Sequence, residues 1–577
     1  MPTTSRRAAA ALSLLSLGMA APLSAKTAQT CTAEALTALG VPSFTVASAK
    51  AAPAEGPFPA RCVVEGTIAT DGDGAGPNSA RLRVQLPETW NGKLVFFGVG
   101  GLAGSLDPSA SPHDFVSALG MGYATAITDT GHVGKNPFDA DWILEAPGKP
   151  NEARIVDYFY RAPHQATIAA KALASKFYGA PGVSRAYFDG CSFGGHMGLM
   201  EAMRYPDDYD GIIAGAPYMD NHTQLWGYKN AKAFLKAHVT PEVVAKVNEA
   251  ILATCDADDG AKDGLIQNPG KCSFDPQSLV PATLTQAQAD AFKIFMAPVT
   301  DSHGRTIYPG SPISDLAAAD GPAGGFVGWV VTPTPAADPA AAEPWGAAPP
   351  VLWAAAEGFT KFIDLHDPTV DFNNNWPETD GRIADDALSQ FDARLGIGDA
   401  DQPERLAPFF NEGKKLILYH GYGDTAISPF RTVWFYEDLA KAAGGYDKVS
   451  DHARLFMAPG MLHCLGGDGP DNFDTLAALD AWVEQGKAPD GIIASKFPGG
   501  KTGQKALRTM PLCAFPNRLD TAERATSIRP RTGPASGATS RSSTSAPMAS
   551  RRAWAQAGSS GSHARTDAQE PAAERLP

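Results

Sequence analysis

The sequence predicts an α/β fold in which a mostly parallel sheet is covered by helices on both faces. Its strands are predicted by three short apolar segments, residues 93–97, 186–188 and 415–419, each of which runs into a turn that contains glycine. A helical stretch follows the second strand as far as Tyr205. Buried strands that alternate with helices along a chain are typical of parallel sheets.

The chain of 577 residues is long for one compact domain, since hydrophobic cores usually stop growing at about 250–300 residues. Residues 222–408 differ from the rest: Pro, Ala, Asp and Gly are more frequent, and strands no longer alternate clearly with helices. We interpret this segment as a lid domain. We expect it to be inserted into an α/β domain that comprises residues 26–221 and 409–520, and to exclude water from a site at the sheet edge.

Both ends of the chain differ from the globular part. In residues 1–25, the positively charged Arg6 and Arg7 precede an apolar run. The run is too short for the roughly 20 residues of a membrane span, so we predict a signal peptide. We therefore expect a periplasmic or secreted protein. Residues 521–577 contain eight Arg, no Lys and only four acidic residues, with Trp554 as the single bulky aromatic, which predicts a disordered tail.

The formal net charge of -14 argues against nucleic acid or an anionic membrane surface as a partner. No later segment is long and apolar enough to span a bilayer. The composition leaves a small-molecule substrate open and does not indicate an oligomeric state.

A candidate nucleophile lies at the end of the second strand. The segment Gly190-Cys191-Ser192-Phe193-Gly194 fits the G-x-S-x-G pattern of a nucleophile elbow, whose sharp turn leaves little room for side chains beside the serine. Such a pattern also arises by chance, but a strand before it and a helix after it favour a true elbow. The oxyanion would then be bound by the backbone N–H of Phe193 and by one from the Gly100-Gly101 turn.

The acid and the base are expected after the serine in the order acid, then histidine. Asp424 follows the third predicted strand, and His463 follows a fourth, residues 455–457. We predict that His463 takes the proton from Ser192 and that Asp424 orients His463 and stabilises its charged form. Four other histidines are rivals for the base, but a structural role is favoured for each: His132, His164, His196 and His420.

Two cysteines flank the predicted catalytic residues. Cys191 directly precedes Ser192, and Cys464 directly follows His463. If the serine and the histidine meet, their neighbours come close enough for a disulfide, and export makes disulfides plausible. The alternative is two unrelated buried cysteines.

The pattern Cys191-Ser192, then Asp424, then His463-Cys464 resembles the tannase and feruloyl esterase family, in which a disulfide joins the two cysteines. The resemblance extends over roughly residues 31–516. It implies an α/β-hydrolase fold with a lid, and hydrolysis of feruloyl or galloyl esters through an acyl-enzyme. One departure is His196, where many members carry Arg.

An acidic loop at residues 255–266 combines carboxylates with glycines. From the residues alone, a solvated turn and a Ca²⁺ loop explain it equally well, and it is not an EF-hand because the twelfth-position Glu is absent. The resemblance favours a structural Ca²⁺ site in the lid and also implies a disulfide between Cys255 and Cys272. The ligands that it implies are the side chains of Asp256, Asp259 and Asp263 and the carbonyls of Ala261 and Leu265.

Cys31 and Cys62 are then expected to form an N-terminal bridge, which leaves Cys513 over. In relatives, the cysteine that matches Cys513 pairs with one further downstream, whereas here the resemblance ends near Pro516. The Lys-free tail is therefore consistent with a frameshift, which resequencing of the gene would test.

Several functions remain open at this point. One relative in the family cleaves a terephthalate monoester with a lid arginine that binds the free carboxylate, whereas Lys361 is the only Lys or Arg between Trp345 and Trp376. We therefore rank that substrate lower than a feruloyl or galloyl ester. Another acyl hydrolase, such as a peptidase, and a catalytically silent exported binding protein are further alternatives.

Overall fold

The computed structural model describes residues 30–108, 112–321, 323–375, 378–379, 382–383 and 398–517. The predicted signal peptide at residues 1–25 and the predicted tail at residues 521–577 lie outside these ranges. In the described part of the chain, no helix combines the length and the apolar character that a membrane crossing requires.

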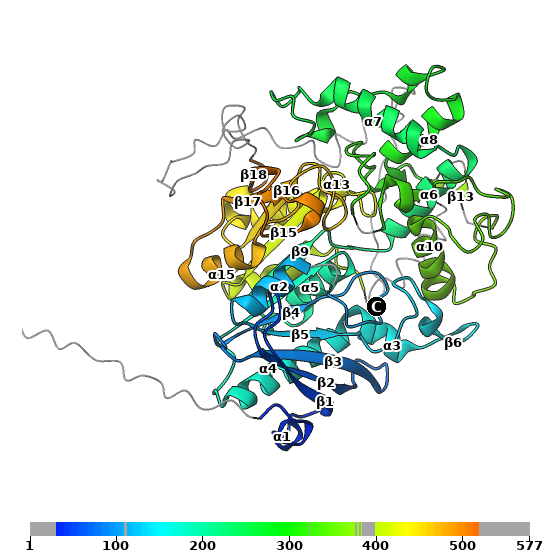
Figure 1. Cartoon of the computed structure of the whole chain (residues 1–577). Coiled ribbons are helices and arrows are strands. Elements are labelled where there is room, and N and C mark those ends of the chain that lie inside the picture. Colours follow the sequence, from blue (N-terminus) through cyan, green and yellow to red (C-terminus); the bar gives the residue numbers. More distant parts are fainter. Residues whose placement is uncertain are drawn as a thin grey trace, which may run out of the picture.

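A nine-stranded sheet forms the centre of the molecule (Figure 1). Each neighbouring pair from β1 through β2 and β3 to β5 is antiparallel, and from β5 onward all neighbouring pairs are parallel. This mixed, mostly parallel sheet confirms the predicted α/β fold. In spatial order the strands are β1 (Phe44–Ala52), β2 (Arg61–Thr70), β3 (Asn78–Pro87), β5 (Ala124–Thr128), β4 (Lys93–Phe97), β8 (Arg185–Cys191), β9 (Gly211–Gly215), β15 (Lys415–Gly421) and β16 (Ala453–Ala458).

Helices cover both faces of the sheet. Residues 186–191 of β8 are all buried although alternate side chains of a strand point to opposite faces, so neither face of the central strands meets solvent. These helices are α1 (Ala33–Ala38), α2 (Pro112–Gly120), α3 (Glu152–Val156), α4 (Ala162–Tyr178), α5 (Phe193–Arg204), α13 (Pro429–Ala443), α14 (Tyr446–Val449) and α15 (Thr475–Gln485). Among them, α5 contacts β8 and β9, and α15 contacts β9 and β15.

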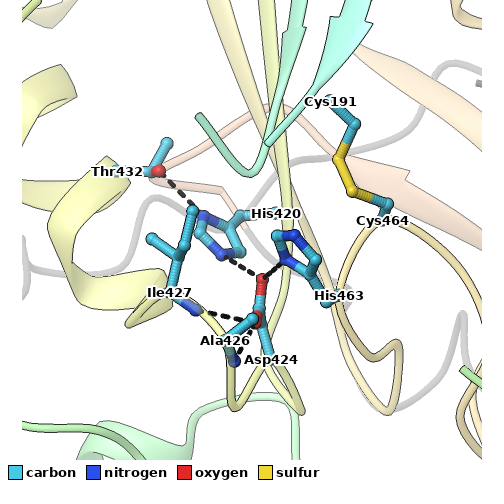
Figure 2. Close-up of a disulfide and its surroundings, with 8 residues drawn as sticks. All are labelled: Cys191, His420, Asp424, Ala426, Ile427, Thr432, His463 and Cys464. Carbon is cyan, nitrogen blue, oxygen red and sulfur yellow. Dashed lines mark hydrogen bonds and ion pairs between the residues drawn. A yellow bond between two sulfur atoms is a disulfide. The ribbon is translucent and has the colours of Figure 1, made fainter. Parts of the chain in front are cut away.

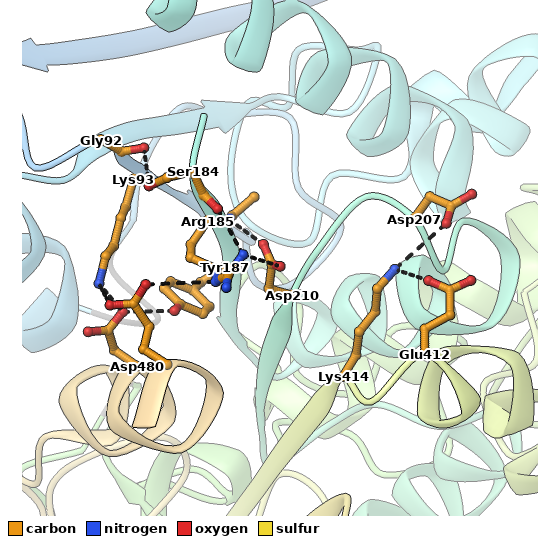
Figure 3. Close-up of polar contacts among 12 residues, drawn as sticks. Gly92, Lys93, Ser184, Arg185, Tyr187, Asp207, Asp210, Glu412, Lys414 and Asp480 are labelled. Atoms are coloured by element: carbon orange, nitrogen blue, oxygen red, sulfur yellow. Dashed lines mark hydrogen bonds and ion pairs between the residues drawn. The ribbon is translucent and has the colours of Figure 1, made fainter. Parts of the chain in front are cut away.

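Polar contacts fasten α15 to the sheet at the ends of the strands opposite the nucleophile turn (Figure 3). Lys93 Nζ lies 2.6 Å from a carboxylate oxygen of Asp480, and the Tyr187 hydroxyl donates to the same carboxylate at 2.7 Å. Lys414, which precedes β15, pairs with Glu412 at 2.7 Å. Lys93 and Lys414 each have a carboxylate partner, so we assign these contacts a structural role.

The segment between β9 and β15 forms a separate group of helices, drawn in green at the upper right of Figure 1. In this group α6 (His222–Lys236) packs against α8 and α10, and Tyr228 and Trp353 form a small core of their own with Phe372. The other elements are α7 (Pro241–Cys255), α8 (Gln286–Met296), α9 (Phe326–Trp329), α10 (Val351–Gly358), α12 (Ala407–Asn411), β10 (Val299–Thr300), β11 (Thr306–Tyr308), β12 (Val330–Val331), β13 (Glu378–Thr379) and β14 (Arg382–Ile383).

Short elements complete the chain. The hairpin of β17 and β18 follows α15, and β18 contacts β16. These elements are β6 (Leu144–Ala146), β7 (Lys149–Pro150), β17 (Gly491–Lys496), β18 (Arg508–Cys513), η1 (Asp141–Ile143), η2 (Asp157–Arg161), η3 (Pro269–Lys271), η4 (Pro276–Leu279), η5 (Phe359–Asp364), η6 (Pro403–Leu406) and η7 (Pro498–Gly500).

Three disulfides form, and they are the three that were predicted: Cys31–Cys62, Cys191–Cys464 and Cys255–Cys272. The first ties the start of the described chain to β2, and the third closes the acidic loop after α7. Cys513 lies on β18 outside these bridges.

The end of β4 and the start of α5 approach each other through glycine. A Cβ atom added to Gly98 would lie 2.6 Å from the Cα of Gly194, closer than real Cβ contacts come. Since both partners are backbone, neither can move aside without shifting the turn that carries Ser192.

We predict that Gly98→Ala lowers the free energy of unfolding by about 1–3 kcal/mol, because the added methyl overpacks this contact. Calorimetry or denaturant titration measures the loss. The matched control is Gly120→Ala, since Gly120 lies in α2 with no atom within 4 Å of its added Cβ. The control should change stability by less than about 1 kcal/mol, in the stabilising direction, and equal losses in both variants would contradict the packing argument.

Candidate active site

The three predicted catalytic residues come from distant parts of the sequence and follow strands of the same sheet. Ser192 follows β8, Asp424 follows β15 and His463 follows β16. The strands run parallel, so their carboxyl ends meet at one edge of the sheet, which is where α/β proteins place their sites. Both Ser192 and His463 line one cavity there.

Ser192 occupies a strained turn. Its backbone angles are φ 63° and ψ −125°, a region that residues with side chains rarely adopt. The turn is held on both sides: the N–H of Ser192 donates to the carbonyl of Gly215 at 2.9 Å, and its own carbonyl accepts from the N–H groups of His196 and Tyr218 at 3.1 and 3.0 Å. This is the geometry that the G-x-S-x-G pattern predicts.

The predicted oxyanion-binding groups lie beside the nucleophile. Phe193 is the first residue of α5, so its N–H has no partner within the helix, and Gly100 and Gly101 line the same cavity as Ser192. The ring of Tyr158 stacks on that of Phe193 with centroids 3.9 Å apart, and its hydroxyl donates to the carbonyl of Gly101 at 3.1 Å. One tyrosine therefore braces both segments.

Asp424 is buried and accepts four hydrogen bonds (Figure 2). Its Oδ2 accepts from Nδ1 of His463 at 2.7 Å and from Nε2 of His420 at 2.9 Å, while Oδ1 accepts from the N–H groups of Ala426 and Ile427 at 2.7 and 3.0 Å. Burial alone would raise the pKa of Asp424. The charge of His463 and the hydrogen bonds of both rings outweigh it and hold this pKa well below its usual range.

The four other candidate histidines each hydrogen-bond a group other than Ser192. His420 uses both ring nitrogens, one for Asp424 and the other for the hydroxyl of Thr432 at 2.8 Å. The remaining three each bond a different group: His132 the carbonyl of Leu102 at 2.7 Å, His164 the carboxylate of Asp208 at 2.6 Å, and His196 the carbonyl of Tyr218 at 3.0 Å. His196 stands where many family members carry Arg, and its buried ring stacks on that of Phe193 with centroids 4.6 Å apart.

The disulfide Cys191–Cys464 joins the two halves of the site covalently, with its Cα atoms 5.9 Å apart. It connects the residue before Ser192 to the residue after His463, which are 273 positions apart in the sequence (Figure 2). The nucleophile turn and the histidine loop are therefore fixed relative to each other by a covalent link as well as by packing.

The cavity at Ser192 has a volume of about 860 Å³, within the usual range for small-molecule sites. One part of its lining comes from the sheet domain, and the other, here called the wall, comes from elements between β9 and β15. The lining as a whole is largely apolar. The ring of Trp329 meets His463 edge to face with centroids 5.3 Å apart. The apolar lining is completed by Phe138, Leu352, Ala355, Phe359, Ala426, Ile427 and Leu465.

The acidic loop turns its carboxylates toward its own backbone. Asp256 accepts from the N–H groups of Asp263 and Gly264, Asp259 from those of Ala261 and Gln267, and Asp263 from that of Leu265. The guanidinium of Arg508 on β18 donates to the carbonyl of Asp263 at 2.6 Å. An all-oxygen donor set suits Ca²⁺.

The positions of these carboxylates set a condition on ion binding. Within the described chain, the three side chains with ligand atoms all within 4.8 Å of one another are His164, Glu201 and Asp208, not the loop aspartates. The loop offers the oxygen donors that Ca²⁺ prefers, but in this structure its three carboxylates do not converge on one point and would have to rotate inward to hold one ion.

Comparisons with known proteins agree with this geometry. The family model for tannase and feruloyl esterase matches residues 62–525. A mono(2-hydroxyethyl) terephthalate hydrolase of Piscinibacter sakaiensis is 33% identical over 80% of this chain and 82% of its own, and a probable feruloyl esterase of Arthroderma benhamiae is 30% identical over 75% and 78%.

A solved structure supports the fold. Feruloyl esterase B of Aspergillus oryzae superposes with a TM-score of 0.68 over 83% of this chain and 94% of its own, at 24% identity. It has the α/β-hydrolase fold that the sheet order and the position of the nucleophile turn indicate. From the match of the family model and the identity to these relatives, the chain belongs to the tannase and feruloyl esterase family of serine esterases.

Proposed function

We propose that this protein hydrolyses esters of aromatic carboxylic acids through an acyl-enzyme on Ser192. The observation that carries the proposal is the hydrogen bond of 2.7 Å between Asp424 and His463 at a cavity that also exposes Ser192. Asp424 accepts a hydrogen bond from Nδ1–H of His463, which leaves Nε2 as the nitrogen that would take the proton of Ser192.

The reaction proceeds in two matched halves. Ser192 Oγ attacks the ester carbonyl carbon while His463 Nε2 takes its proton, and the N–H groups of Phe193 and Gly101 stabilise the oxyanion. Collapse of this intermediate breaks the bond to the alcohol, which leaves with the proton from His463. Water then attacks the acyl-enzyme in the same way and releases the acid and the free Ser192.

The shape of the cavity supports an aromatic acyl group. Trp329 and Phe359 supply flat apolar surface, and Leu352 and Ala355 extend it. The polar side chains Thr223 and Gln224 of α6 lie on the same wall, where they supply hydrogen-bonding groups for phenolic hydroxyls.

The charges around the cavity favour an acid without a second carboxylate. Among the described residues that line the cavity, Lys135 is the one Lys or Arg; its side chain is 75% exposed, and it pairs with Asp141. Asp107 and Asp320 line the cavity as well. Lys361, the single Lys or Arg between Trp345 and Trp376, is not in the lining and pairs with Glu357 and Glu343.

We therefore rank feruloyl and galloyl esters above a terephthalate monoester, because the described lining offers a free carboxylate only the exposed side chain of Lys135, which already pairs with Asp141. The terephthalate monoester remains the second candidate, because the relative from Piscinibacter sakaiensis bears that name at 33% identity.

We also propose that the protein is exported to the periplasm or the medium. The three disulfides support this location, because oxidising compartments preserve structural disulfides.

The proposed chemistry predicts that methyl ferulate or methyl gallate is hydrolysed and that Ser192→Ala lowers kcat by at least about 10³-fold, as loss of a triad nucleophile does. The terephthalate monoester is assayed in parallel and should give the lower kcat/KM. The matched control is Ser105→Ala, since Ser105 lines the same cavity without the elbow geometry. Ser105→Ala should keep kcat within about threefold. A purified, folded protein that cleaves none of these esters would support the silent binding protein instead.

We propose that the bridge Cys191–Cys464 keeps the serine and the histidine in register. The double variant Cys191→Ala/Cys464→Ala should lose more than about tenfold in kcat/KM, since small displacements of catalytic groups are costly. The matched control is Cys31→Ala/Cys62→Ala, which removes a bridge at the other end of the sheet. The control should lower the thermal midpoint but keep kcat/KM, whereas equal kinetic losses in both variants would argue against a specific role at the site.

We further propose that Ca²⁺ binds the acidic loop through Asp256, Asp259 and Asp263 and the carbonyls of Ala261 and Leu265. Once these side chains rotated inward, the ion would neutralise three carboxylates of the loop and pin it beside the Cys255–Cys272 bridge. Its role is structural, since the loop residues do not line the cavity at Ser192.

Chelation should therefore lower the thermal midpoint by about 2–5 °C, because an ion at saturating concentration stabilises the folded state. Differential scanning fluorimetry with EGTA and with added Ca²⁺ measures the shift. Asp259→Asn should abolish the response to Ca²⁺, whereas Asp258→Asn, its neighbour outside the proposed ligand set, should retain it. A midpoint that is the same with and without Ca²⁺ would count against the site.

A further inference from the structure

His420 holds the catalytic acid from the side opposite His463, and nothing in the triad mechanism assigns it a task. We propose that His420 is a positioning residue that fixes the Asp424 carboxylate and weakens its hold on the proton of His463. This inference rests on the proposed triad and deepens it by adding a fourth member, supported in turn by Thr432.

The hydrogen bonds determine which nitrogen of His420 carries the proton. Asp424 is ionised and only accepts, so Nε2 of His420, 2.9 Å from Oδ2, must be the donor. In the neutral ring Nδ1 is then an acceptor, and the hydroxyl of Thr432 donates a hydrogen bond to it at 2.8 Å. Thr432 on α13 thus selects the tautomer of His420 that can hold Asp424 (Figure 2).

The two rings share one oxygen. Oδ2 of Asp424 accepts one hydrogen bond from His463 at 2.7 Å and another from His420 at 2.9 Å. Both hydrogen bonds are buried, where hydrogen bonds to an ion are strong. Each donor withdraws negative charge from the other. His420 therefore limits how strongly Asp424 attracts a proton on His463, while it also keeps Oδ2 in place.

The sign of the expected effect follows from this competition. Without the His420 donor, Asp424 stabilises the imidazolium form of His463 more strongly, so the base stays protonated to a higher pH. The acid limb of the kcat/KM profile then moves to higher pH. The position of Oδ2 is also less restrained, so kcat falls at every pH.

Other titratable groups near the acid must be separated from this effect. Asp315 packs against the Asp424 turn, because a Cβ on Gly423 would lie 3.1 Å from the Cβ of Asp315. Burial raises the pKa of Asp315 to about 7, so its titration contributes to any pH profile measured near neutrality. Further charged groups are Asp468 and Arg508, which act on Asp315, and Lys135, Asp107 and Asp320, which line the cavity. On α13, Arg431 precedes Thr432 and pairs with Asp220 and Asp401.

Two matched pairs of variants test the proposal in the full-length protein. His420→Leu removes the donor, and His420→Gln keeps a neutral N–H donor near the same place. Thr432→Val removes the hydroxyl that sets the tautomer, and Thr432→Ser retains it. Asp315→Asn removes the nearby titration and serves as the control for the pH profile.

The first measurement is the rate at which a fluorophosphonate probe labels Ser192 as a function of pH, because this rate depends on the triad but not on which ester is the substrate. The second is kcat and KM for the best ester. His420→Leu should lower the labelling rate and kcat about 10- to 100-fold, the effect of a lost hydrogen bond to a charged group. KM should stay within about twofold, and the acid limb should rise by about 0.5–1 pH unit.

The paired variants should recover most of this loss. The labelling rate and kcat of His420→Gln and Thr432→Ser should lie within about fivefold of the wild-type values. Thr432→Val should have a labelling rate and kcat between those of these two variants and those of His420→Leu, with a smaller rise of the acid limb. Asp315→Asn combined with His420→Leu should show the same shift as His420→Leu alone. A shift that disappears in this background would assign the effect to Asp315 and overturn the proposal.

The outcomes separate this inference from the proposed function. If the wild-type protein is not labelled at Ser192, the triad itself is wrong. If it is labelled, and both His420→Leu and Thr432→Val keep the wild-type rate and acid limb, His420 is only a packing residue and the inference fails. Should His420→Leu not fold, as circular dichroism would show, the comparison of Thr432→Val with Thr432→Ser decides alone.

Discussion

The buried carboxylate of Asp424 is the group on which the arrangement of the site depends. A carboxylate withdrawn from water is costly unless donors replace the lost solvation. Here four N–H groups do so, and they come from β15, from the turn after it and from the loop after β16. Satisfying this one charge therefore forces three segments into a fixed relation, and the position of His463 follows from it.

The nucleophile half of the site is braced separately. Tyr158 stacks on Phe193 and bonds the carbonyl of Gly101, so the two segments expected to bind the oxyanion move as one unit. The bridge Cys191–Cys464 then connects this unit to the loop that carries His463. Each half is rigid through its own contacts, and the disulfide fixes the distance between the halves.

The parts of the site that could be predicted from the sequence are those with a local signal. Ser192 has glycines on both sides, and Asp424 and His463 follow apolar strands, so their place at the sheet edge follows from parallel topology. Tyr158 has no such signal, because its partners lie 35 and 57 positions away and follow no periodic pattern. His420 was visible only as a rival base, since its hydrogen bond to Asp424 depends on the turn between them.

The cavity wall was equally hidden in the sequence, and it carries the question of substrate. Trp329 and Phe359 were visible as isolated aromatic residues in a segment without clear periodicity, and only the fold brings both to Ser192. The charge pattern also depends on the fold, because Lys361 is drawn away from the cavity by Glu357 and Glu343. In the proposed function, the placement of charges in the lid therefore bears on which ester is accepted, whereas the proposed chemistry at Ser192 depends on the position of Asp424 and its donors.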